Sequence, residues 1–169
     1  QRSYETAVFW LGRAVRKRPG DFHALLAQAN AYGWLADSFF VRRCWPESRH
    51  ARLTQYAIVE RLQSRDAENA AISFRLAAAR RGLAHSYHQL GEGENAREQL
   101  VEALALVTRL IARDSQNAEW RSLKVLLDRD LARMPPRLPP AAMGSCHSNR
   151  ATNPNSSASH VPFATAARI

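Results

Sequence analysis

The sequence predicts an all-α fold of about six antiparallel helices, on the strength of two observations. Apolar residues, mainly Leu and Ala, recur at spacings typical of amphipathic helices, and short polar or Gly-containing segments separate these runs. The same pattern also returns along the chain at a constant interval, which is typical of helical-repeat domains. We therefore expect one helical-repeat domain over residues 1–133 and a segment of different character over 134–169.

The repetition has a period of 48 residues. A Leu-Ala pair begins at positions 35, 83 and 131. The same offset relates Arg61-Leu62 to Arg109-Leu110, Asp66 to Asp114, and Asn69-Ala70 to Asn117-Ala118. Agreement in register at this many positions indicates an internal repeat.

The helices expected from this pattern lie near 3–18, 22–41, 46–64, 67–90, 94–113 and 117–133. The first is the second helix of a truncated repeat, since Tyr4 and Ala7 match Leu100 and Ala103 two periods on. Residues 22–65 and 67–113 are two complete repeats, and 117–133 is the first helix of another truncated repeat. Pro46 suits the first turn of the third helix. The turn after the fourth helix contains Gly91 and Gly93.

The best-preserved copy resembles a tetratricopeptide repeat. The resemblance rests on the spacing of seven residues, Leu83, Ala84, Tyr87, Gly91, Ala96, Leu100 and Ala103. It implies a right-handed α-α superhelix in which the two helices of each repeat approach closely at small Ala residues. The family's period is 34 residues, and we interpret the longer period here as about two extra turns in each helix. Two extra turns rotate the apolar stripe about the helix axis by only ~20°, so the same face of the helix stays packed.

The resemblance also implies a non-catalytic scaffold that binds a peptide or protein segment. In the family the first helix of each repeat lines a concave groove, and the matching positions here are Asn30, Gly33, Asp37, Phe40, Arg81, His85, His88, Arg129 and Arg133. Arg and His can meet an acidic group, and Phe40 can hold an apolar anchor. The alternative interpretation of these residues is an ordinary solvated face.

The net charge of +9 leaves a second function open, a basic helical-repeat module that contacts nucleic acid. We expect most of the Arg side chains, including Arg80 and Arg81, to lie on solvated helix faces, because acidic residues are interspersed with them. Seven aromatic residues could stack on bases, but we expect most of them to fill the core: Trp10, Trp34, Trp45, Trp120, Phe39, Phe40 and Phe74. Trp45 and Phe40 are the two for which an exposed position is considered.

Enzyme and cofactor sites are not predicted. Cys44, His50 and Asp37 have no spacing that requires a catalytic set. His85 and His88 share a helix face, but no third metal ligand is evident and the two cysteines lack CxxC spacing. We therefore expect no cofactor and no metal.

After Met134 the composition changes to Pro and then to Ser, Asn, Ala and Thr, which predicts a disordered tail over 134–169. No apolar run is long enough to span a bilayer, and no signal peptide heads the sequence, so we expect a cytoplasmic protein without membrane contact. Only Lys17 and Lys124 are lysines, and all other basic residues are Arg. This preference for Arg over Lys indicates a GC-rich bacterial genome. Uncapped helices at the two ends of an array could also support self-association.

Overall fold

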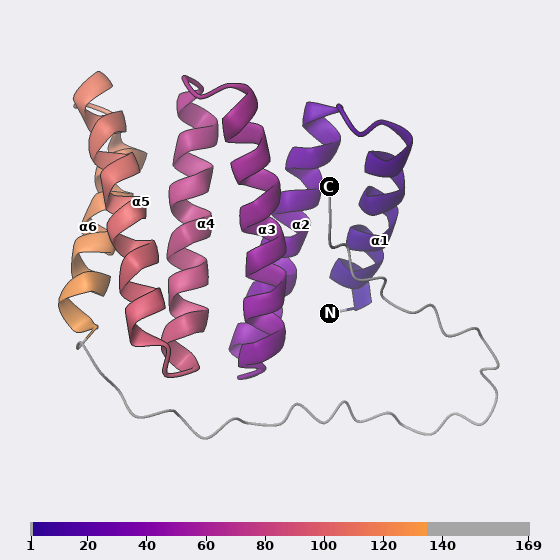
Figure 1. The fold of residues 1–169 in the computed structure, drawn as a ribbon, viewed down its shortest axis with the longest axis horizontal. Helices are drawn as coiled ribbons and strands as arrows, with labels where there is room; N and C mark the ends of the chain where they lie inside the picture. Colours follow the sequence, from indigo (N-terminus) through magenta and orange to yellow (C-terminus); the bar gives the residue numbers. More distant parts are fainter. Residues whose placement is uncertain (1, 135–169) are drawn as a thin grey trace.

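The computed structural model describes residues 2–134 and contains six α-helices in this part of the chain. These are α1 (Arg2–Lys17), α2 (Phe22–Val41), α3 (Trp45–Arg65), α4 (Ala70–Gln89), α5 (Gly93–Arg113) and α6 (Ala118–Arg133). Figure 1 shows them side by side, with α1 and α6 at opposite ends of the row. Each helix packs on its neighbours in the chain, and α4 also contacts α6. The predicted all-α array of packed neighbouring helices is confirmed.

The period of 48 residues is also a period of the structure. Helices α2, α4 and α6 begin after Asp21, Asn69 and Asn117, and each of these side chains accepts a hydrogen bond from the backbone N–H three residues on. Capping of this kind satisfies one of the unpaired donors at a helix start. The turns repeat as well, because Arg43 and Gly91 both have a positive φ, of 61° and 76°. The three caps and two turns therefore place matching residues at matching points of successive hairpins.

The fourth helix is shorter than expected. It begins at Ala70 instead of residue 67, because Asn69 has extended backbone angles and caps the helix through its side chain. Its 20 residues correspond to a length of about 30 Å. The other observed helix ends lie within one residue of the predicted ones.

The Ala residues of the first two Leu-Ala pairs lie at fully buried helix contacts. Ala36 and Ala84 have no exposed surface, and neither do Ser48 and Ala96 on the following helices. Ser48 occupies the position that Ala96 has one period later, and its hydroxyl donates to the carbonyl oxygen of Ala36 at 3.0 Å. This hydrogen bond lets a polar residue fill a buried site in the first hairpin without an unpaired hydroxyl.

The prediction that the large aromatic residues fill the core is wrong for two of them. Trp10 on α1 is 58% exposed and Trp34 on α2 is 57% exposed. Both lie at the α1 end of the row, where no further helix of the described chain covers them. Phe74 and Trp120 do pack against the main core cluster, and Phe39 packs against a smaller one.

No helix in the described part of the chain is long and apolar enough to cross a membrane. The disordered tail expected over 134–169 lies outside the described residues, apart from Met134. That residue is buried against the core cluster that includes α5 and α6.

Candidate functional site

Side chains from three alternate helices meet on one side of the array, which we call the α2–α4–α6 face. Phe40 of α2 lies against His85 of α4, with ring centroids 6.4 Å apart. His85 in turn contacts Asp130 of α6. A further link joins α4 to α2, since Arg75 donates to the side-chain oxygen of Asn30 at 3.3 Å. The first helices of successive repeats are thus connected directly through side chains.

Asp130 is the centre of this face. Its Oδ2 accepts hydrogen bonds from Nε of Arg81 at 2.7 Å and from Nε2 of His85 at 2.8 Å, and the Asp130 side chain is only 11% exposed. Burial acts to raise the pKa of Asp130, but the hydrogen bonds from His85 and Arg81 outweigh it and hold that pKa below its ordinary value. A buried carboxylate with two donors is a fixed structural element, so it positions Arg81 and His85.

The surroundings of His85 favour its neutral form. Burial lowers its pKa, and the neighbouring charges of Arg81 and Arg52 act in the same direction, whereas the hydrogen bond to Asp130 acts against them. The neutral ring donates its Nε2–H to Asp130 and presents its side to Phe40. Phe40 also packs edge-on against Trp45, with ring centroids 4.8 Å apart. An apolar patch of Phe40 and Trp45 therefore borders the polar cluster.

Arg52 reaches this face from α3. It occupies the position that Leu100 has in the next repeat, and its guanidinium lies over Gly82, where an added Cβ would be 2.6 Å from the Arg52 Cζ atom. From there Arg52 forms an ion pair with Asp37 and donates to Oε1 of Gln55 at 2.7 Å. A Gly on the facing helix thus makes room for a charged side chain at a position where the next repeat has Leu.

The structure brings together only some of the residues predicted for the groove. Phe40, Arg81 and His85 form one cluster connected through Asp130, whereas Asp37 pairs with Arg52, which lies over Gly82. Asn30 lies apart, bonded to Arg75, and His88 is partly buried. Arg129 and Arg133 are exposed on α6.

Asp130 and Arg52 were missed at the sequence level. Asp130 stands next to the Leu131-Ala132 pair, and Arg52 is in register with the core residue Leu100. A signal for Arg52 was present, because a charged residue at a core position needs a counter-ion, and Asp37 lies on the preceding helix.

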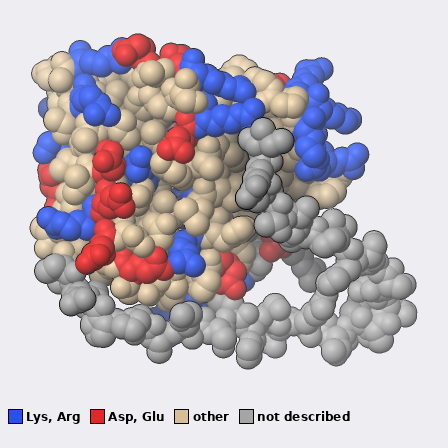
Figure 2. Space-filling model, in the orientation of Figure 1, with Lys and Arg blue, Asp and Glu red and all other residues tan. Residues whose placement is uncertain are grey.

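Arg80 and Arg81 are exceptions to the solvated positions expected for most Arg side chains, because both are partly buried. Arg81 pairs with Asp130, and Arg80 donates to Gln99 at 2.8 Å and to the hydroxyl of Tyr56 at 3.1 Å. On the face shown in Figure 2, basic and acidic side chains are interspersed, with basic ones gathered towards the α1 end. There Arg16 and Lys17 occupy the last turn of α1.

Among the described residues no group of three His, Cys, Asp or Glu side chains is placed to hold a metal ion. Asp37 is engaged by Arg52, and His50 is exposed on α3.

Comparison with known proteins gives no match: no family model, no curated protein and no solved structure is significantly similar to this chain.

Proposed function

We propose that this chain is a tetratricopeptide-like scaffold that binds a peptide or protein segment along the α2–α4–α6 face. The observation that carries the proposal is the cluster of Phe40, Arg81, His85 and Asp130, which joins three helices on one side of the array. Side chains on such a face are held by one another, so a ligand meets a surface whose conformation is already fixed. Little conformational entropy is then lost on binding.

The chemistry of this face favours a segment with an apolar anchor and acidic groups. Phe40 and Trp45 supply an aromatic patch at the α2 side. Arg129 and Arg133 are exposed at the α6 side, and the charges of Arg81 and Arg52 are already balanced by Asp130 and Asp37. An extended peptide with an apolar side chain near one end and carboxylates near the other would match both regions.

Selection of peptides from a displayed random library on the full-length chain tests this proposal. The selected peptides should combine an aromatic or large aliphatic residue with Asp or Glu. Titration calorimetry with one such peptide should then show at least tenfold weaker binding for Phe40→Ala and for Arg129→Glu. Because Arg129 is exposed, its substitution should leave the fold intact.

Arg97→Glu and Arg109→Glu are matched controls, since both side chains are exposed on α5, a second helix of a repeat. They change the net charge as Arg129→Glu does and should leave peptide affinity unchanged. Equal weakening by all three charge reversals would mean that binding follows net charge, which would contradict a site on the α2–α4–α6 face.

Salt dependence separates this proposal from the nucleic-acid alternative. Binding through phosphates weakens steeply between low and physiological ionic strength, whereas an anchored peptide contact weakens much less. Single-stranded oligonucleotides that bind only at low salt would count as non-specific attraction to the basic chain. We further propose that the protein is bacterial and cytoplasmic, and that this chain is part of a larger signalling or regulatory protein.

A further inference from the structure

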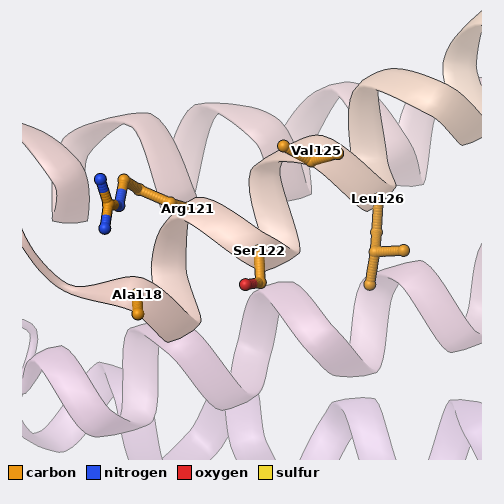
Figure 3. A pocket seen from close by; sticks show the side chains of 5 residues that line it. All are labelled: Ala118, Arg121, Ser122, Val125 and Leu126. Carbon is orange, nitrogen blue, oxygen red and sulfur yellow. The ribbon is translucent and has the colours of Figure 1, made fainter.

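Helix α6 carries an open, mostly apolar stripe along one side. The stripe borders a hollow of about 550 Å³ lined by Ala118, Arg121, Ser122, Val125 and Leu126 (Figure 3). These positions follow the spacing of one helix face. Val125 at its centre is 65% exposed.

The period of the structure shows what kind of element fits this stripe. One period earlier, the position of Val125 is held by Ala77 on α4, and Ala77 has no exposed surface. The position of Ala132 is held by Ala84, which is also fully buried, whereas Ala132 is exposed. On α4 these residues belong to the core cluster formed with α5. Helix α6 therefore presents the surface that takes the second helix of a repeat, and no such helix covers it in residues 2–134.

Helix α1 has the complementary open face, because it is in register with α5. Leu11 corresponds to Val107, which is fully buried, yet Leu11 is only partly buried. Ala14 corresponds to the buried Leu110 and is exposed. Trp10, 58% exposed, corresponds to Leu106, which packs against two core clusters. The face of α1 that would pack on the first helix of its own repeat is thus apolar and is not covered by residues 2–134.

A polar contact that recurs in the array is also left incomplete at α1. Arg65 at the end of α3 donates to the carbonyl oxygen of Gly20 at 3.4 Å, and Arg113 at the end of α5 donates to that of Glu68 at 2.9 Å. Both donors and acceptors are separated by 48 residues. Lys17 at the end of α1 holds the position of Arg65 and Arg113. The carbonyl oxygen of Gln116, just before α6, holds the position of the acceptors Gly20 and Glu68.

The 48-residue register also indicates a contact for the exposed Trp34. Arg81 and His85 of α4 contact Asp130 of α6. One period after Arg81 and His85, the donor positions are held by Arg129 and Arg133 of α6. In a second copy stacked beyond α6, the acceptor position one period after Asp130 would be held by Trp34 of its α2. A helix pair stacked beyond α6 would bring these two exposed Arg side chains over an exposed indole ring, which is a favourable cation–π arrangement.

We propose that α1 of a second copy of this chain docks along α6, so that the copies associate head to tail. Its Trp10 and Leu11 would cover Val125, its Lys17 would reach Gln116, and its Trp34 would lie under Arg129 and Arg133. This proposal does not depend on the peptide site proposed above, and it concerns association of the 169-residue chain itself.

The sequence of the chain after α6 is a poorer occupant of this stripe. Positions in register with Leu100, Val107 and Leu110 are Ser148, Asn155 and Ala158, with Pro154 between them. Such a segment lacks the apolar stripe that α3 and α5 use, and proline within a helix removes a hydrogen bond. A second copy supplies both the apolar residues and the recurring basic residue at the helix end.

A head-to-tail contact joins two different surfaces and is therefore heterologous. One copy uses α1 while another uses α6, so each copy retains one open end. Such an interface extends into rows of several copies and does not stop at a symmetric dimer. Complementary variants can distinguish these two forms of association.

The test is sedimentation of the full-length chain over a range of concentrations, for Trp10→Glu, Val125→Glu and their mixture. The unsubstituted chain should form larger species as concentration rises, and each variant alone should associate at least tenfold more weakly. An equimolar mixture should restore association but stop at two chains, because one variant keeps an intact α6 and the other an intact α1. Val101→Glu, a 47% exposed position on α5, is the matched control and should associate like the unsubstituted chain.

Circular dichroism should show unchanged helix content in every variant, because all three substituted side chains are exposed. If Trp10→Glu or Val125→Glu loses helix, Ala14→Glu on α1 or Arg121→Glu on α6 replaces it. A chain that stays monomeric at all concentrations would overturn the proposal. Association that survives both substitutions, or that is not restored in the mixture, would also overturn it.

Discussion

Arg52 and Gly82 show how a charged residue is accommodated between two helices of this array. The guanidinium occupies the space that a side chain at position 82 would need. Glycine inside a helix costs about 1 kcal/mol relative to alanine, so this arrangement reduces helix stability in order to keep the pair between Arg52 and Asp37. Burial also lowers the pKa of Arg52, which the Asp37 carboxylate opposes.

A double-mutant cycle measures this coupling. Gly82→Ala should destabilise the chain that has Arg52, because the guanidinium must move. In an Arg52→Ala background the same change should stabilise by about 1 kcal/mol, through helix propensity alone. Urea unfolding of the four chains gives the coupling energy, and additive effects would show that Arg52 does not lie over Gly82.

His85 should make stability depend on pH. Its pKa in the folded chain lies below the ordinary value of 6.5, so the unfolded chain binds the proton more tightly. The free energy of unfolding should therefore be highest above pH 6.5 and fall as the pH drops towards the folded pKa. The groups facing His85 are Asp130, Arg81 and Arg52, and Asp130, with its own lowered pKa, contributes only at still lower pH.

The comparison of the unsubstituted chain with His85→Gln checks this effect. Urea unfolding at pH 7.5 and at pH 5.5 should show a smaller loss of stability in the variant. An equal loss in both chains would assign the pH dependence to other groups.

The family resemblance put Arg81 and His85 on one face of the fourth helix, and in the structure both contact Asp130. Their grouping agrees with helix periodicity, because residues four apart lie on the same side of a helix. The link from His85 to Asp130 could not be predicted, because it depends on the offset between successive first helices. That offset is set by packing and not by the period of 48 alone.

For the helices, the packing of α4 against α5 can be tested by substitution at its buried Ala residues. Ala84 and Ala96 are fully buried, and a larger side chain at either position has no space to enter. Ala96→Trp should lower stability by a few kcal/mol, measured as a lower melting temperature. Ala105→Trp on the same helix is the control, since Ala105 is exposed and should tolerate the change. An unchanged melting temperature for Ala96→Trp would contradict the observed packing.

The helices themselves were largely predictable from the 48-residue pattern and from the residues that end each run. The start of α4 was misplaced because Glu68 and Asn69 were included in the helix, although Asn is a preferred capping residue. Asp21, Asn69 and Asn117 share the same register, so comparing the three starts would have fixed this boundary.

At the scale of the whole molecule, the two ends of the array differ from its middle. Trp10 and Trp34 were expected in the core because large aromatic residues of helical repeats normally fill the space between adjacent hairpins. In the described chain they lie at one end and remain exposed, as Val125 does at the other. Their exposure depends on position in the array, a property that local periodicity does not contain.

The most direct test of the account is NMR mapping of a selected peptide on the full-length, isotope-labelled chain. Amide shifts should change along α2, α4 and α6, centred on Phe40 and His85, and Phe40→Ala should require at least tenfold more peptide for the same changes. Changes confined to α3 and α5, or peptide binding that leaves the α2–α4–α6 face unperturbed, would contradict it.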